Sequence, residues 1–277
     1  GALNIGYELV RERFPTADTI LEMDADTILE EHFIERTEAA MRANDRIGGL
    51  CACFLGRRRP GSNLWNRFLI WGQRTEYARF NGNQLTLEAA VLSGTASLLR
   101  VKALQRLKAV RGYVWSEVCL AEDLETTKAL QQRGWLCMTD RSFVSYTDVM
   151  TTWGDLAQQR KRWQRGTLDV IYRLYHRKRC VRREAWSQRL MYVAYPFQVA
   201  TYAFIGLSSL WWQIAWMPLL ATFVLLSLYN GLCSRKAGWR AVLIALLYVP
   251  CEVYTFLRYC LLVRSWWLYR KQSVQSW

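Results

Sequence analysis

The spacing of apolar and polar residues divides the chain into two unlike halves. Up to about Trp186, charged residues are frequent and apolar residues recur with the period of helices or strands, whereas long apolar stretches dominate afterwards. In the first half the pattern predicts helices over 2–14, 30–44, 64–80, 121–134 and 151–163, and strands over 19–27, 47–56, 135–139 and 142–147, with 98–107 a strand turning into a helix. This alternation indicates a mixed α/β domain.

Three apolar stretches in the second half are candidates for membrane helices. Leu190–Trp212 has no charged residue and exceeds the roughly 20 residues needed to cross a bilayer, and Ile214–Cys233 is a second stretch of this kind. The third, Ala241–Val263, contains Pro250, Glu252 and Arg258, so we expect it to be tilted, broken or re-entrant near Pro250 unless the tail is external. Glu252 and Arg258 would then face the bundle interior as partners.

Charge supports a membrane location over a nucleic-acid role. The chain has 37 Lys and Arg against 23 Asp and Glu, a net charge of +14, and the basic residues crowd 160–165 and 176–184, just ahead of the apolar stretches. Such a belt is typical of a cytoplasmic membrane border, so the N-terminal half is predicted to be cytoplasmic. The eight cysteines form no C-x-x-C pair and only two histidines are present, which indicates reduced, buried thiols and no zinc site.

The sharpest chemical signal is the D-A-D segment within "LEMDADT". Asp24 and Asp26 follow an apolar strand, and in an extended segment alternate side chains share one side. Two such carboxylates suit a hard divalent cation that shares its shell with substrate phosphates. The alternative is a solvated Asp-rich turn.

Two further segments are ambiguous when taken singly. "AEDLE" holds Glu122 and Asp123, and acidic residues at a helix start also serve simply to cap it. "VLSGTASLLR" holds Gly94 and Thr95, whose small side chains let backbone approach a ligand or merely form a tight turn.

A last motif, Q-x-x-R-W, lies at the border of the apolar half. Thr152 and Asp155 have capping-box spacing, so the segment is predicted to be helical. On a helix Gln159, Arg162 and Trp163 project from one face, offering an amide, a guanidinium and an indole together. The alternative is an ordinary amphipathic interface helix.

In this order, A-L-N, D-A-D, S-G-T, A-E-D and Q-x-x-R-W followed by apolar spans, the chain resembles the processive family 2 glycosyltransferases, membrane enzymes that make cellulose, chitin, hyaluronan and poly-N-acetylglucosamine. The resemblance implies a GT-A-like, Rossmann-like catalytic domain over 1–165, a basic interfacial linker over 166–189 and a multi-pass plasma-membrane region over 190–277 with two or three helices. The family's upstream nucleotide-binding segment has no counterpart here, so the domain is expected to be incomplete at its N-terminus.

The resemblance also implies roles for the motif residues. Asp123 would be the general base, Asp26 the metal ligand, and Asp24, Gln159 and Arg162 the contacts to the donor diphosphate. Acceptor contacts would come from Trp163, Glu122, Gly94 and Thr95. The implied reaction is an inverting displacement from a nucleotide sugar, such as a UDP-sugar, onto a growing β-linked polysaccharide, with Mg²⁺ or Mn²⁺.

The implied partners are the donor, the polymer, membrane lipids and an accessory synthase subunit, with no nucleic acid. Two other interpretations stay open. One is a non-processive transferase acting on a lipid or other acceptor, and the other is an inactive synthase that serves as a membrane scaffold.

Overall fold

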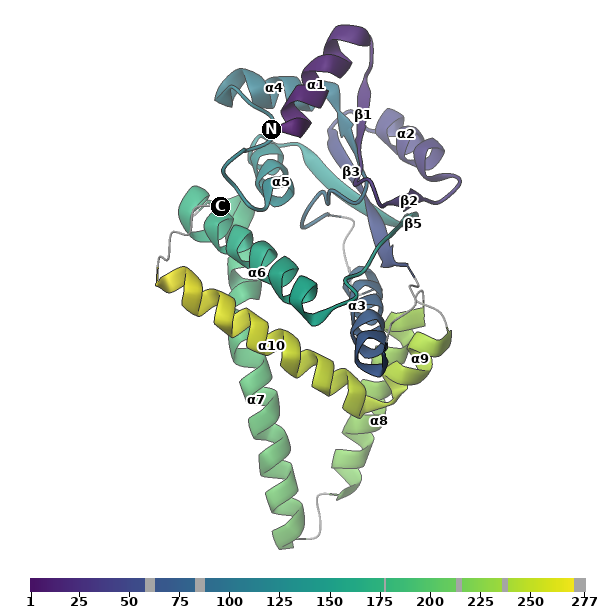
Figure 1. Cartoon of the computed structure of the whole chain (residues 1–277), viewed down its shortest axis with the longest axis vertical. Coiled ribbons are helices and arrows are strands. Elements are labelled where there is room, and N and C mark those ends of the chain that lie inside the picture. The colour runs from purple at the N-terminus through teal and green to yellow at the C-terminus, as the bar shows by residue number, and fades with distance from the viewer. Residues whose placement is uncertain (58–62, 83–87, 177, 213–215, 236–238, 272–277) are drawn as a thin grey trace. The chain divides into compact units, whose positions relative to one another are not determined.

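The computed structural model describes residues 1–57, 63–82, 88–176, 178–212, 216–235 and 239–271 (Figure 1). Residues 58–62, and the links that follow the first two apolar stretches, lie outside these residues. The chain divides into two compact units. The first comprises Gly1–Arg58, Gln84–Asp148 and Arg165–Arg182, and the second comprises Arg59–Asn83, Val149–Gln164 and Arg183–Trp277.

The first unit is built on a five-stranded mixed sheet. Its strands lie in the order β1 (Thr19–Glu22), β4 (Ser97–Arg100), β3 (Ile47–Gly56), β5 (Leu136–Thr147) and β2 (Ile28–Leu29). β3 and β5 pair in parallel, whereas the β1–β4, β3–β4 and β2–β5 pairs are antiparallel. The long apolar β3 is buried along nearly its whole length, as expected for a strand in the middle of a covered sheet.

Helices cover both faces of this sheet (Figure 1). One face packs against α2 (Phe33–Ala43), and the other packs against α4 (Val101–Arg111) and α5 (Glu122–Gln132), with α1 (Ala2–Arg13) nearby. The core under α2 alternates along the strands, because every second side chain points to the same face. Its buried members are Phe33, Met41, Ile47, Leu50, Ala52, Ala96, Leu98 and Phe143. The unit ends with short helical segments η1 (Val170–Leu174) and η2 (Arg179–Val181).

Two details of the first unit differ from the sequence prediction. The segments 135–139 and 142–147 form one strand, β5, whose pairing with β3 shifts register between Cys51 and Cys53. Ser142 bonds to the Asp140 carboxylate at this irregularity, so the polar residues that looked like a strand break are accommodated within the strand. The D-A-D segment is not extended, because β1 ends at Glu22 and the chain then turns.

The second unit is helical in its described residues. It contains α3 (Leu64–Gly82), most of α6 (Trp153–Asp169), α7 (Arg182–Trp212), α8 (Trp216–Ser234), α9 (Trp239–Leu246) and α10 (Tyr248–Arg270). The third predicted span is broken, since α9 ends before Leu247 and α10 begins after it, with Pro250 in the first turn where no backbone donor is needed.

One helix in the described part of the chain, Arg179–Ser208, is long and apolar enough to cross a membrane, and none of its apolar window is buried. The apolar helix Leu220–Ser234 is shorter than this. The predicted pairing of Glu252 with Arg258 is wrong. Glu252 accepts two bonds from Gln198 Nε2, both 3.1 Å, whereas Arg258 lies 3.2 Å from Glu76. Glu76 belongs to α3, so the partner came from a helix far away in the sequence.

Candidate active site

The D-A-D segment forms a turn held against a second loop. The Thr27 amide donates to the Asp24 carbonyl at 3.1 Å, and the Asp24 amide donates to the Gly94 carbonyl at 2.8 Å. Asp24 and Asp26 are both exposed, and the Thr147 hydroxyl donates to Asp26 Oδ1 at 3.4 Å. The turn therefore presents two carboxylates to solvent at the end of β1.

The S-G-T segment is the loop that receives this turn. A Cβ on Gly94 would lie 3.4 Å from Asp24 Oδ1, so the Asp24 carboxylate rests on bare backbone. The Ser93 and Thr95 hydroxyls are 2.6 Å apart, and the Ser97 hydroxyl donates to the Ser93 carbonyl at 2.9 Å. These two hydrogen bonds within the segment restrain the loop.

Asp123 stands in the first turn of α5, as the sequence predicted. Its Oδ1 accepts the Leu124 amide at 2.7 Å, and a backbone bond from Gly94 also reaches the carboxylate. Burial, followed by the charges of Glu122 and Asp24, raises the pKa of Asp123 to about 6 against the lowering effect of these two bonds. The carboxylate is thus ionised at neutral pH and basic enough to accept a proton.

Thr127, one turn further along α5, links the helix to the S-G-T loop. Its hydroxyl donates to the Asp123 carbonyl at 2.6 Å and accepts the Leu92 amide at 2.8 Å. The residue has no exposed surface. One side chain therefore fixes the register between the Asp123 turn and the loop that contacts Asp24.

Glu22 is a member of this acidic group that sequence reasoning missed. Burial raises the pKa of Glu22 to about 8, and the charge of Asp123 acts in the same direction, while the bond from Trp115 Nε1 at 3.1 Å opposes it. At neutral pH one carboxyl of the group is thus largely protonated and another ionised. The available signal was alternation, because positions 22, 24 and 26 are all acidic.

The start of α5 is anchored by three further contacts within the first unit. Arg111 Nη1 lies 2.6 and 2.8 Å from the two Glu125 oxygens, and the Tyr175 hydroxyl donates to Glu125 Oε1 at 2.7 Å. Gly166 packs so closely that a Cβ there would lie 2.7 Å from the Ala121 nitrogen. The Asp123 turn is therefore restrained by contacts from three other segments of the unit.

A divalent cation fits the exposed carboxylates only with ligands from elsewhere. Among the described residues, no three His, Cys, Asp or Glu side chains are grouped so that they would hold a metal ion. Asp24 and Asp26 are oxygen donors of the kind that Mg²⁺ and Mn²⁺ prefer, and phosphate oxygens of a substrate would complete the shell.

The Q-x-x-R-W segment lies on α6 in the second unit. The predicted cap is present, since the Asp155 amide donates to Thr152 Oγ1 at 3.2 Å and this hydroxyl donates to Asp155 Oδ2 at 2.7 Å. Arg162 is exposed, and its side chain makes no ion pair or hydrogen bond with the residues that the structure describes.

Gln159 is half-buried, and Trp163 keeps 37% of its surface exposed. The first unit thus brings together Asp24, Gly94, Glu122 and Asp123. Asp26 lies in the D-A-D turn and Thr95 in the S-G-T loop. Gln159, Arg162 and Trp163 belong to the second unit.

Comparison with known proteins places these residues in a family. The sequence profile described as glycosyl transferase family group 2 matches residues 19–269. No protein with a curated description matches the chain. Among solved structures the chain is similar to a mannosyltransferase from Pyrobaculum calidifontis in complex with GDP-Man and Mn²⁺, with 14% identity and a TM-score of 0.49. The match covers 95% of this chain and 65% of that one.

Proposed function

The chain belongs to the glycosyl transferase family group 2, and from that premise we propose that it extends a β-linked polysaccharide from a nucleotide sugar with inversion at the anomeric carbon. The mixed α/β first unit agrees with the GT-A-like fold expected for such an enzyme. The observation that carries the proposal is the meeting of Asp24, Gly94 and Asp123 at the turn after β1.

Asp123 is the proposed general base. Its carboxylate takes the proton from an acceptor hydroxyl as the acceptor oxygen bonds to the anomeric carbon of the donor. The bond from that carbon to the phosphate oxygen breaks, and the nucleoside diphosphate leaves with the electron pair. A base with a pKa of about 6 is ionised before the reaction and protonated after it. It then releases this proton to water at neutral pH, so each sugar transferred releases one proton.

Asp26, with Asp24, would hold the cation, which when bound supplies positive charge to the leaving diphosphate. Mg²⁺ and Mn²⁺ both suit this oxygen set. Asp24 rests on the backbone of Gly94, a position with no side chain. Gly94, Thr95 and Glu122 are proposed to border the acceptor.

On α6, Gln159 and Arg162 are proposed to bind the diphosphate, and Trp163 the sugar at the end of the polymer. The exposed guanidinium of Arg162 suits phosphate oxygens, and the partly exposed indole suits a sugar ring. These assignments favour a processive synthase over an enzyme that transfers a single sugar.

The site is proposed to act at the cytoplasmic side of the plasma membrane. The helix Arg179–Ser208 would cross the bilayer, because its apolar window is unburied and basic residues precede it. The apolar helices that follow are proposed to complete a multi-pass region, and an accessory subunit is a further proposed partner.

The direct test is sugar incorporation in membranes that carry the chain, supplied with UDP- and GDP-sugars one at a time. We expect metal-dependent polymer from one donor, and no transfer by Asp123→Asn. The matched control is Asp45→Asn, at a carboxylate whose side chain is 97% exposed, which should transfer as the wild type does. Products one sugar long would favour the non-processive alternative. Protein that folds and inserts yet transfers nothing from any donor would favour the scaffold.

A further inference from the structure

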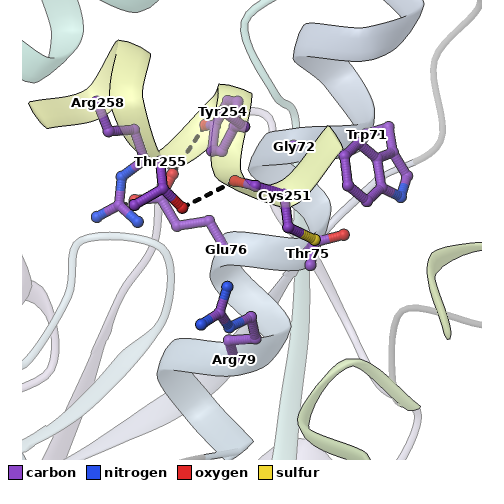
Figure 2. Close-up of a pocket in the computed structure, with 9 residues that line it drawn as sticks. All are labelled: Trp71, Gly72, Thr75, Glu76, Arg79, Cys251, Tyr254, Thr255 and Arg258. Carbon is purple, nitrogen blue, oxygen red and sulfur yellow. Dashed lines mark hydrogen bonds and ion pairs between the residues drawn. The ribbon is translucent and has the colours of Figure 1, made fainter. Parts of the chain in front are cut away.

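A largely buried ionic cluster in the second unit includes one residue of the Q-x-x-R-W segment. Glu76 of α3 accepts bonds from Arg160 Nη2 and the Tyr254 hydroxyl, both at 2.9 Å, and pairs with Arg258 Nη2 at 3.2 Å. Figure 2 shows Glu76, Tyr254 and Arg258 converging from α3 and α10. Arg160 comes from α6, so one carboxylate joins three helices.

Arg160 occupies one of the two variable positions of the motif, between Gln159 and Arg162. Its guanidinium carbon lies 4.4 Å from the centre of the Trp163 ring and 5.7 Å from that of Tyr77. These distances are within cation–π range. Its Nε and Nη1 atoms are buried and, among the described residues, meet no hydrogen-bond acceptor. The contacts of the guanidinium on that side are with the rings of Trp163 and Tyr77.

The cluster keeps its charges despite burial. Burial by itself would raise the pKa of Glu76, but Arg160 and then Arg258 outweigh it, so the pKa is lowered. Burial would lower the pKa of Arg160, but Glu76, followed by Tyr77 and Tyr254, together outweigh it, so the pKa is raised. A planar cation that stays charged and is fixed by a carboxylate can hold an adjacent indole in one orientation.

We propose that Arg160 is a positioning residue that sets the orientation of the Trp163 ring for a sugar, and that Glu76 holds Arg160 in place. The inference rests on the proposed function, because it takes Trp163 as the acceptor contact. It adds a residue that the motif leaves undefined, and it predicts that oligosaccharide affinity depends on a buried ion pair behind the ring.

The test measures binding of cellohexaose, chitohexaose and mannohexaose to the purified full chain in detergent, separately from turnover. Arg160→Lys keeps the charge and the pairing with Glu76 but loses the planar cation over the ring, so the protein should fold and bind the hexasaccharide about fivefold more weakly. Nucleotide-sugar binding should not change.

The matched control is Arg258→Lys, which alters the other arginine that pairs with the same carboxylate. It should leave hexasaccharide affinity within twofold of wild type. Among the described residues Arg258 pairs with Glu76, whereas the arginine over the Trp163 ring is Arg160. In a Trp163→Ala background, Arg160→Lys should cause no further loss, since Arg160 would act through the ring that is gone. A merely structural role would give equal losses in both backgrounds.

Three results would overturn the inference. They are unchanged hexasaccharide affinity in Arg160→Lys, an equal loss in Arg258→Lys, and wild-type protein that binds none of the three hexasaccharides. Hexasaccharide binding that follows the expected pattern without sugar transfer from any donor would instead contradict only the proposed catalytic activity.

Discussion

Replacing Thr127 by Val tests whether the register between α5 and the S-G-T loop controls both stability and chemistry. The two side chains have nearly the same shape, so the change removes the hydroxyl and little else. The Leu92 amide loses its acceptor at 2.8 Å inside the protein, which costs about 2 kcal/mol, and the lost bond to the Asp123 carbonyl adds up to about 1 kcal/mol. The melting temperature should fall by roughly 5–10 °C.

The assay combines a melting curve with the sugar-transfer rate, and the neighbouring residue supplies the control. Thr126 is also buried, and its hydroxyl donates to the Val114 carbonyl at 3.3 Å, but it accepts no backbone amide from the residues that the structure describes. Thr126→Val should therefore lower the melting temperature by less than half as much and leave transfer intact. Thr127→Val should slow transfer about 10- to 100-fold, because the loop beneath Asp24 shifts.

Thr127→Ser restores the hydroxyl and should recover most of both properties. Equal melting temperatures for Thr127→Val and Thr126→Val would refute the reasoning. A serine variant as impaired as the valine variant would refute it as well, because the loss would then come from the missing methyl group and not from the bonds.

Three other outcomes follow from the site. If Asp123 is the proposed base, it acts when deprotonated, and its pKa is raised to about 6. Transfer rates should therefore fall about tenfold per pH unit below that value, and a flat profile from pH 7 to pH 5 would remove Asp123 from the role. Gly166→Ala should lower both the melting temperature and the transfer rate, because the added Cβ would collide with the backbone of Ala121. The control Gly6→Ala should change neither, because no atom lies within 4 Å of the Cβ it adds. Equal shifts in melting temperature for the two variants would contradict this. Removing divalent cations with a chelator should abolish sugar transfer until Mg²⁺ or Mn²⁺ is added back. Asp26→Asn should raise the metal concentration needed for half-maximal transfer, and an unchanged concentration would exclude Asp26 as a ligand.

Local sequence signals were sufficient for elements whose causes are local. The helix that bears Q-x-x-R-W begins with the predicted bonds between Thr152 and Asp155, because a capping box depends on residues three positions apart. Helix α5 is followed by Gly134, whose φ of +82° suits a residue without a Cβ. Strand β3 spans the predicted residues 47–56 because its apolar run is buried on both faces.

The motif spacing alone could not show how the site is assembled. That Asp24 and Asp123 meet at Gly94 depends on the strand order β1-β4-β3-β5-β2, and strand pairing is a property of the folded sheet, not of any single segment. The prediction for Glu252 and Arg258 was wrong for the same reason. The two residues lie about a turn and a half apart on one helix, but Glu252 bonds to Gln198 and Arg258 pairs with Glu76, each on another helix.

The sequence by itself therefore determined most of the elements, the motif residues and the family, since these depend on periodicity, caps and residue identity along the chain. The tertiary structure decided which carboxyl stays protonated, as with Glu22, and which arginine stacks on the indole, as with Arg160. Burial and contacts between distant segments set both properties, and they exist only once the sheet and helices have packed.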